Sequence, residues 1–381
     1  MANVLTDLAA DIYKAADIVG REAVGFIPSV TINSGSEAAA QGDTVRAAFT
    51  RAATVNSSAT PSMTIPEGDD QTVDNKTMTL DTVKSVRIPW TGEDIKHVNN
   101  GSGFETLYGD QIAQAFRALT NAVEADVAAE AYKGASRAVG TAGTTPFASN
   151  FDTVAEARQI LFDNGMPVND GRLSLIVNSA AGTNLRNLAQ LQKVNEAGGS
   201  QLLRQGELLN LQGAMLKESG QVQSHTKGTG TSYLLNDASS AIGDTTIAAD
   251  TGSGTIIAGD IVTFAGTSDK YVVNTALSGG SFTIGGPGLR AAEADNDAIT
   301  VGNSYTANVM LHQSAVELAM RPLEKPFGGD AAVDVMNVQD PHSGMVYQIS
   351  VYKGYNKAMI DVTVLYKAKA WKEDAIALLL G

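Results

Sequence analysis

One helical segment of 31 residues, from 103 to 133, constrains the fold of this chain more than any other part of its sequence. Its apolar residues recur at the i, i+3 and i+4 spacing of an amphipathic helix. They include Phe104, Leu107, Ile112, Phe116, Leu119, Val123 and Val127. No proline occurs in the segment, no glycine follows Gly109, and Gly134 ends it. At about 1.5 Å per residue the helix spans roughly 45 Å, so it can act as a strut between distant parts of a fold.

The residues before this helix indicate an arm followed by a hairpin. Apolar positions between 4 and 24 have helical spacing, and such a helix packs either on its own domain or on a neighbouring subunit. Residues 45–50 alternate as a short strand does, a polar turn follows, and residues 78–90 read as one long strand. An isolated two-stranded hairpin is marginal in water, so we expect it to lie on another surface.

After the long helix, helices and strands alternate. Thr153 and Glu156 form a capping-box pattern ahead of a helix that ends near Gly165. Residues 173–177 read as a buried strand, and a further helix follows it. This alternation is typical of a mixed α/β domain.

From about 225 to 305 the sequence predicts only strands. Gly-rich turns separate short β-type runs at 246–248, 260–264, 271–273, 281–284 and 298–301. This pattern predicts a small all-β barrel or sandwich. Beyond it, residues 312–320 read as a helix ending before Pro322, and strands are predicted around 349–351 and 360–366. A β module that interrupts another domain is an inserted domain, whose two ends must lie close together.

Composition excludes several function classes. The formal net charge of -14 disfavours a nucleic-acid-binding surface, which needs clustered Lys and Arg. The chain has no cysteine and four isolated histidines, so neither a thiolate nor a His-based metal site is expected. No phosphate-loop motif and no Gly-x-Ser-x-Gly motif occur, and Asp295-Asn296-Asp297 reads as a solvated turn rather than a calcium loop. We therefore expect no catalytic residue, no cofactor and no bound metal.

Targeting and membrane signals are also missing. The first 30 residues lack a basic region followed by a long apolar core, so they do not read as a secretory signal. No run of about 18 apolar residues occurs, and no membrane span is expected.

The order of parts resembles a known family. An arm, a hairpin, a spine-length helix, an α/β domain, an inserted β module and a return to the α/β domain follow one another. Shorter segments add to the resemblance: Met1-Ala2-Asn3, Asn121-Ala122-Val123-Glu124-Ala125-Asp126, Gly259-Asp260-Ile261-Val262-Thr263-Phe264-Ala265-Gly266, His312-Gln313-Ser314-Ala315 and Asp340-Pro341-His342-Ser343-Gly344. The chain resembles the major capsid proteins of tailed bacteriophages, which have the Hong-Kong-97-like fold. More narrowly, it is similar to the short-tailed-phage coat subfamily of the P-twenty-two type, which carries an inserted domain.

The resemblance implies an α+β fold with a definite division of the chain. The expected parts are an N-terminal arm (1–40), an extended β-hairpin loop (41–85), a peripheral domain (86–170) with the spine helix 103–133, a first axial part (171–223), an inserted β-barrel (224–305), and a second axial and peripheral part (306–381).

It also implies a function. The chain would self-assemble as pentamers and hexamers into an icosahedral shell around double-stranded DNA, which it contacts non-specifically. Scaffolding and portal proteins would be its partners, with assembly in the host bacterial cytoplasm and maturation by expansion. Gly-rich joints, Gly328-Gly329 among them, are candidate hinges. The candidate subunit contacts are Ile12, Phe26, Phe49, Ile65 and Pro66.

Three alternatives remain open at this stage. A phage tail-tube protein and a surface-layer or adhesin protein are also rich in Thr, Gly and Ala and contain β modules. A tail-tube protein is mostly β, however, and a surface protein carries an export signal. An encapsulin-type compartment shares the capsid fold but lacks the inserted barrel.

Overall fold

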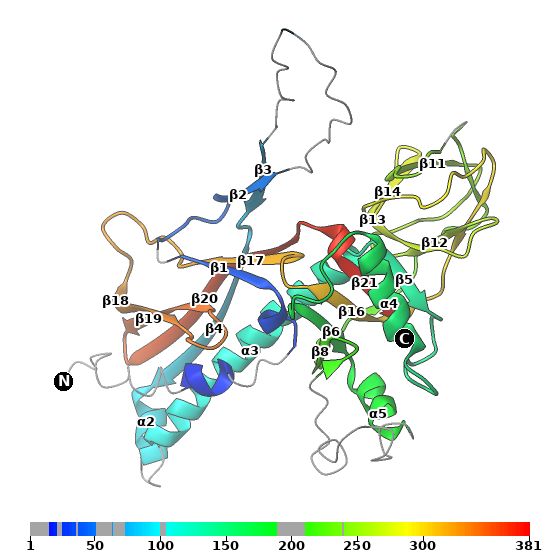
Figure 1. Ribbon diagram of the computed structural model, residues 1–381. Helices are drawn as coiled ribbons and strands as arrows, with labels where there is room; N and C mark the ends of the chain where they lie inside the picture. The colour runs from blue at the N-terminus through cyan, green and yellow to red at the C-terminus, as the bar shows by residue number, and fades with distance from the viewer. Residues whose placement is uncertain are drawn as a thin grey trace.

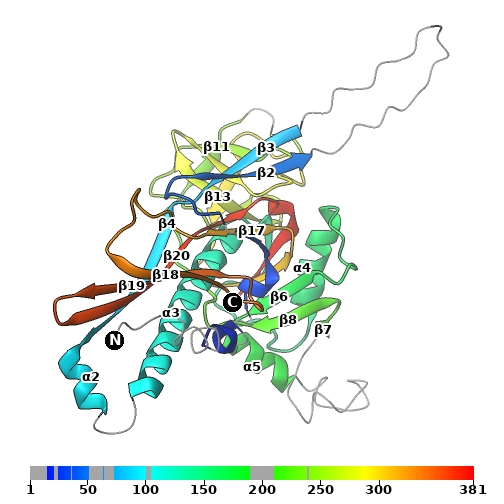
Figure 2. The same cartoon turned by 90° about the vertical axis from the view of Figure 1, so that its left-hand side faces the viewer.

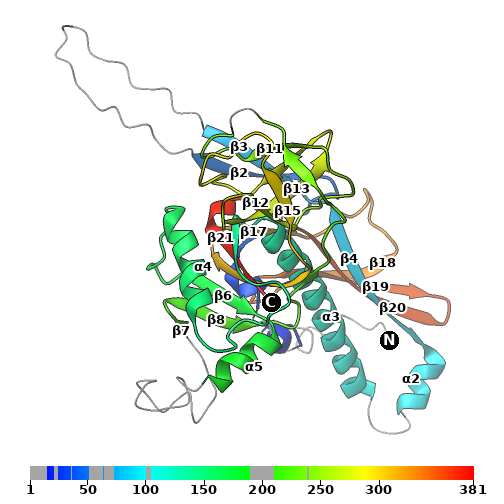
Figure 3. The ribbon, with the colours of Figure 1, turned by 90° about the vertical axis from the view of Figure 1, so that its right-hand side faces the viewer.

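The computed structural model describes residues 15–20, 25–35, 37–50, 63, 73–99, 104–188, 210–237 and 240–381. These residues form a mixed α+β fold with two large sheets, one long helix and a two-stranded hairpin (Figure 1). Views from the two sides show the paired strands of the hairpin at the same end of the molecule as the β-barrel (Figure 2; Figure 3). The mixed composition agrees with the α+β class expected from the sequence.

Helix α3, Phe104–Lys133, confirms the long helix predicted from the sequence. The shorter helix α2, Gly92–Asn99, precedes it. The buried side chains of α3 belong to the main apolar cluster of the chain and include Ile112, Phe116, Leu119, Val123 and Val127. A β-carbon at Gly134 would lie 2.4 Å from the side chain of Ala370, so glycine at this position allows α3 to end directly against strand β20, Lys357–Ala370.

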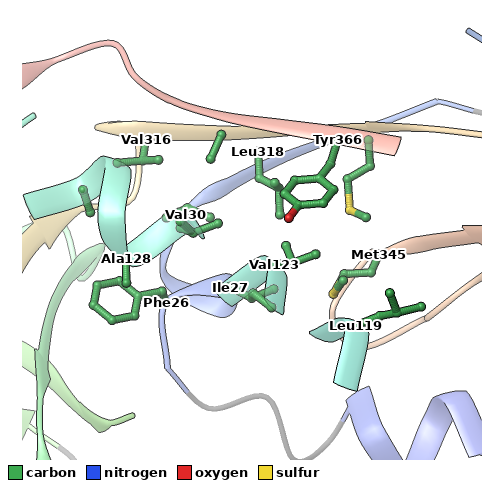
Figure 4. Packing of buried hydrophobic residues seen from close by; sticks show 14 of the residues in the cluster. Phe26, Ile27, Val30, Leu119, Val123, Ala128, Val316, Leu318, Met345 and Tyr366 are labelled. Atoms are coloured by element: carbon green, nitrogen blue, oxygen red, sulfur yellow. The ribbon is translucent and has the colours of Figure 1, made fainter. Parts of the chain in front are cut away.

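A six-stranded sheet packs on α3. Its strands are β1 (Thr31–Ser34), β17 (Val316–Arg321), β20, β19 (Val346–Gly354) and β18 (Ala332–Gln339), in that order, with β4 (Thr82–Thr91) also paired to β20. Val316, Leu318 and Tyr366 on its inner face lie over Leu119 and Val123 of α3 (Figure 4). Together they form a single core between sheet and helix.

The prediction of a helix at residues 312–320 is wrong, because this segment belongs to two strands and the turn between them. Residues up to His312 finish strand β16 (Tyr305–His312), and β17 begins at Val316 after a tight turn. Leu, Ala, Met and Glu in this segment favour a helix locally. However, β17 pairs with β1 on one edge and with β20 on the other, and this tertiary pairing overrides the local preference.

A second, larger sheet holds the middle of the chain and its C-terminus. Strand β16 lies at its centre, between β21 (Ile376–Leu380) and β6 (Leu173–Val177). The sheet continues on one side through β8 (Ala214–Glu218) to β7 (Asn210–Leu211), and on the other through β5 (Arg137–Gly140). Helices α4 (Asp152–Asp163) and α5 (Ser179–Asn187) contribute to the apolar cluster on this sheet. Helix α4 confirms the predicted helix, but its N-cap residue is Phe151, without a side-chain cap, so the predicted capping box is wrong.

A closed six-stranded barrel occupies the region where the sequence predicts only strands. Its strands pair in a ring, β12-β15-β10-β11-β14-β13, which the β12–β13 pairing closes. They are β10 (Tyr233–Leu235), β11 (Thr246–Asp250), β12 (Ile261–Phe264), β13 (Lys270–Ser278), β14 (Ser281–Ile284) and β15 (Ala298–Val301). A separate apolar cluster that includes Leu235, Val262, Tyr271 and Phe282 fills the interior. Five of the six strands match predicted runs, and β10 was missed.

The barrel connects to the rest of the subunit at one end. The chain enters from β9 (Ser224–His225) and returns into β16, and these two strands pair through His225 and Tyr305. The entry and exit points of the barrel therefore lie side by side. Strand β13 also pairs with β5 through Lys270 and Tyr271, so hydrogen bonds join the barrel to the larger sheet.

The hairpin consists of β2 (Thr44–Thr50) and β3 (Val73–Thr79), which form a separate two-stranded antiparallel sheet. The single strand predicted over 78–90 is in fact two strands, β3 and β4. They separate at Leu80, whose side chain is fully buried and whose backbone bonds to Gly42 and Asp43. Met78 and Leu80 pack on Ala319 and Leu365, so the root of the hairpin is anchored in the body.

The described part of the N-terminal segment packs on its own chain. Residues 15–20 are helical, and Ala15, Ala16 and Val19 are buried in the main cluster. A short 3-10 turn, Ile27–Ser29, leads into β1, which runs parallel to β17. Another 3-10 turn, Glu373–Ala375, precedes β21.

Candidate assembly surfaces

The long helix fixes the N-terminal segment through a buried carboxylate. Glu124 of α3 accepts a hydrogen bond from the backbone N–H of Phe26 at 3.3 Å and another from the hydroxyl of Ser219. Two residues further along, Asp126 forms an ion pair with Lys84 of β4 at 2.7 Å. The buried carboxylate of Glu124 needs such partners, and together the contacts of Glu124 and Asp126 hold β4, the N-terminal segment and the chain after β8 to one helix.

The five candidate contact residues from the sequence have different locations. Phe26 is fully buried in the subunit's own core, against Ala128 of α3 (Figure 4). Phe49 lies on β2 of the hairpin. Ile12, Ile65 and Pro66 lie outside the described residues. The Phe26 side chain is therefore enclosed by its own chain.

An exposed apolar surface occurs instead at one end of the six-stranded sheet; we call it the β18 patch. It consists of Phe327, Val333, Val335 and Tyr355, of which Phe327 and Tyr355 are almost wholly exposed. Val333 and Val335 lie on β18, whose outer edge has no strand partner among the described residues. The pairing of Ala332 with Tyr352 places the start of β18 beside the turn that carries Tyr355. Exposed apolar side chains beside an open strand edge are typical of a surface that another chain covers.

A polar network supports this patch. Lys325 donates to Asp330 and to the hydroxyl of Tyr352, at 3.0 and 3.2 Å, and that hydroxyl donates to Asp330 at 2.7 Å. The Tyr352 hydrogen bond, and then that of Lys325, lowers the pKa of Asp330 to about 2. The loop that carries Phe327 is thus tied at its base to β19.

The sequence carries a signal for this loop that was read differently. Phe327 stands between Pro326 and Gly328-Gly329, and both glycines have positive φ. The two glycines predict a hinge, but a large aromatic residue in a Gly/Pro turn also indicates an exposed side chain. The valines of β18 gave no such signal, because alternating valines are equally typical of a buried face.

The structure brings together a histidine, an aspartate and a serine that the sequence does not predict to be neighbours. His312, which the sequence treats as isolated, lies with Nε2 2.8 Å from Asp170 and Nδ1 2.8 Å from the Ser314 hydroxyl. This order of groups matches a Ser–His–Asp relay. However, the Ser314 backbone N–H also donates to Nδ1, at 3.2 Å, within the turn between β16 and β17. The hydroxyl is therefore not placed as an activated nucleophile, and the three side chains hold this turn to the loop before β6.

A second histidine, His225, contacts a buried aspartate where the barrel joins the rest of the chain. His225 and Asp260 are both buried, with Nε2 and Oδ1 2.8 Å apart. Asp260 also accepts backbone N–H bonds from Gly228 at 2.9 Å and from Ile257 at 2.8 Å. The carboxylate is saturated by its own chain, so this pair has a structural role at the joint.

Metal and membrane sites are not indicated in the part of the chain that the structure describes. No three His, Cys, Asp or Glu side chains there gather closely enough to hold a metal ion. Within the same residues, no helix is both long and apolar enough to cross a membrane.

Comparison with known proteins gives a likeness of fold. No family model and no curated protein matches the chain. Among solved structures, the chain is similar to one in the capsid structure of the cyanophage P-SCSP1u, with a TM-score of 0.53 and 11% identity, over 94% of this chain and 88% of that one. This likeness, over nearly the whole length of both, shows that the two chains share a fold.

Two further structures are similar by smaller scores. One is the mature capsid of bacteriophage PhiM1, with a TM-score of 0.48 and 12% identity over 93% of this chain and 86% of that one. The other is from Mycobacterium phage Che8, with a TM-score of 0.47 and 16% identity over 89% of this chain and 84% of that one.

Proposed function

We propose that this chain is the major capsid protein of a tailed bacteriophage, a structural subunit with no catalytic role. One observation carries the proposal: the chain shares its fold, over 94% of its length, with a chain of the cyanophage P-SCSP1u capsid, at a TM-score of 0.53. The resemblance in the order of parts supports the narrower assignment to the Hong-Kong-97-like fold. The closed barrel between β9 and β16 supports the P-twenty-two type, in which an inserted domain interrupts the axial domain.

In this proposal the hairpin joins subunits. Strands β2 and β3 belong to neither large sheet, and a two-stranded sheet alone is marginal in water. Its root is held by Met78 and Leu80, and β2 and β3 lie outside both large sheets (Figure 2). We assign residues 41–85 as an extended loop that lies across a neighbouring subunit and gains its stability there.

The β18 patch is the second proposed contact. Aromatic side chains bury about 150–250 Å² each, and they are enriched in the cores of protein interfaces. The side chains of Phe327 and Tyr355 are exposed to solvent in the single chain, and we assign them to the core of this contact between subunits. Burying them against a neighbour also protects the open edge of β18 from unwanted pairing.

Shell geometry and partners complete the proposal. The same subunit fills pentamers and hexamers, and the turn at Gly328-Gly329 allows the β18 patch to adjust between them. Assembly uses a scaffolding protein and a portal protein in the host bacterial cytoplasm, and the shell expands as double-stranded DNA enters. A net charge of -14 suits a wall that contacts packaged DNA only non-specifically.

Sedimentation velocity and negative-stain electron microscopy of the protein, expressed with and without its neighbouring genes, and analysis of what purified particles contain test the proposal. We expect a single fast boundary from closed shells several hundred ångströms across. Open tubes of stacked rings would favour a tail-tube protein, and a flat lattice would favour a surface-layer protein. Shells that form without a portal and enclose protein instead of DNA would favour an encapsulin-type compartment. A small fixed oligomer under every condition would refute all of these.

A further inference from the structure

A carboxyl group at one end of the barrel is buried without an opposite charge beside it. Glu293 lies in the connection between β14 and β15, and only 6% of this residue is exposed. One of its carboxyl oxygens, Oε1, is buried and has no hydrogen-bond partner among the described residues. An unpaired carboxylate is costly to bury, so the environment of Glu293 decides whether this group carries a proton.

The charged groups that act on Glu293 are acidic. Burial raises the pKa of Glu293 above its ordinary value of 4.5, and the charge of Asp297 and then that of Asp269 raise it further, while a hydrogen bond with Thr267 opposes the rise. Tyr271 of β13 also interacts with Glu293, but burial raises the pKa of its phenol, which therefore stays neutral. The ionised form of the Glu293 carboxyl group is thus disfavoured in the closed barrel.

The two arginines of this region are paired with other carboxylates. Nη1 of Arg137 lies 3.5 Å from Oδ1 of Asp269, and Nη2 of Arg290 lies 3.5 Å from Oδ2 of Asp163. Neither arginine is among the groups that change the pKa of Glu293. In the part of the chain that the structure describes, no cation therefore balances a negative charge on Glu293.

Glu293 also lies where three connections of the barrel meet. Its backbone N–H donates to the carbonyl oxygen of Ser240, in the connection between β10 and β11, at 3.3 Å. Its carboxyl group bonds to Thr267, in the connection between β12 and β13. That second connection continues to Asp269, which pairs with Arg137 of β5 in the larger sheet. A change of charge on Glu293 therefore acts on loops that lead to the joint between the barrel and the rest of the chain.

We propose that Glu293 is a proton-operated latch at this end of the barrel: the protonated carboxyl group holds the connections at 265–269 and 290–297 together, and its ionisation loosens them. An ionised Glu293 places a buried, unbalanced negative charge beside Asp297 and Asp269, and opening of the connections returns that charge to water. A bound proton removes the charge and allows the carboxyl group to donate a hydrogen bond. The latch lies within one chain, so it does not depend on how subunits assemble.

Hydrogen–deuterium exchange of the unassembled, full-length chain measures the opening. Peptides that cover 265–269 and 290–297 are followed between about pH 4 and pH 8, after correction for the intrinsic pH dependence of amide exchange. Glu293 has its ordinary pKa in the open state and a raised pKa in the closed state, so the closed state is fully favoured below pH 4.5 and loses that advantage as the pH rises through the raised pKa. Opening should therefore increase by up to about tenfold per pH unit above pH 4.5 and then level off.

Two substitutions in the same connection separate Glu293 from its neighbours. Glu293→Gln keeps the shape of the side chain but cannot ionise, so opening in this variant should change by less than about threefold over the same pH range. Asp295→Asn is the matched control, because Asp295 lies two residues away and its side chain is exposed. The control variant removes one carboxylate as well, but it should keep the pH-dependent opening of the unsubstituted chain.

Opening that does not change with pH in the unsubstituted chain would overturn the latch. A rise that persists in Glu293→Gln would overturn it as well, because another group would then release the proton. If the glutamine variant does not fold, the unsubstituted chain still decides. A rise confined to the two connections supports the latch, whereas an equal rise in peptides of β11 would assign the proton to unfolding of the whole barrel and overturn it.

Discussion

Replacing Phe26 with alanine should lower the free energy of unfolding of the single subunit by about 4 kcal/mol. The Phe26 side chain is fully buried against α3, and a buried phenylalanine removes about 150–250 Å² from water. At roughly 25 cal/mol per Å² this burial contributes about 4–6 kcal/mol, and Phe→Ala substitutions in cores cost about 3–5 kcal/mol. The loss arises within one chain and does not depend on assembly.

Thermal unfolding of unassembled subunits, followed by circular dichroism, measures this loss. The unfolding entropy is about 2.1 cal/mol/K per residue, or roughly 0.8 kcal/mol/K for 381 residues that unfold together. A loss of about 4 kcal/mol therefore lowers Tm by about 5 °C. Phe327→Ala is the matched control, because this phenylalanine is almost wholly exposed.

Phe327→Ala should change the Tm of the subunit by less than about 1 °C while it weakens assembly. The opposite pattern would refute the reasoning. If Phe26→Ala left Tm unchanged and blocked assembly, Phe26 would be a subunit contact, as the sequence alone suggested. If Phe327→Ala assembled normally, the β18 patch would not be an interface.

Three other measurements test separate parts of the structure. Asp330 has a native pKa of about 2, below its ordinary value of 3.8, so its contacts stabilise the native state above pH 3.8 and lose that contribution as the pH falls toward 2. Asp330→Asn should reduce the pH dependence of unfolding in that window, and an unchanged acid profile would contradict the assigned network. At alkaline pH, burial and then the Asp126 hydrogen bond raise the pKa of Tyr366 above its ordinary value of 10.0, so the unfolded state releases this proton first and stability falls as the pH rises past 10. Tyr366→Phe should lessen that alkaline loss, measured by urea unfolding at pH 9 and 11, and an equal loss in both proteins would contradict the assignment. A fragment of residues 224–305 should give a β-type circular dichroism spectrum and melt cooperatively, because the barrel closes within it. Its midpoint should lie below that of the barrel in the whole chain, since the pairing of β13 with β5 is lost, and a random-coil spectrum would contradict the barrel boundary.

The barrel and the long helix could be predicted because their signals are local. Alternating residues between Gly-rich turns define most barrel strands, and unbroken helical spacing defines α3. Strand β10 was missed because Tyr233-Leu234-Leu235 is too short to show alternation. The predicted helix at 312–320 failed because β17 is a strand only by virtue of its two partners, β1 and β20, which lie far away in sequence.

The candidate contact surface could be predicted only in part. The hairpin was expected from its polar sequence, and β2 and β3 do pair outside both large sheets. The sequence predicts Phe26 as a contact residue because nothing local distinguishes a core aromatic from an exposed one. Val333 and Val335 are exposed because alternate side chains of β18 face away from the core, and which face of a strand is covered is not a property of any single segment.

Electron microscopy of the particles tests the central claim most directly. The claim is that copies of this chain close into an icosahedral shell, with hairpins and β18 patches covered by neighbouring subunits. A reconstruction should show pentamers and hexamers of this subunit, with Phe327 buried between chains and the barrel projecting from each subunit. Tubes of stacked rings, or a small oligomer that leaves the hairpin and Phe327 in solvent, would contradict it.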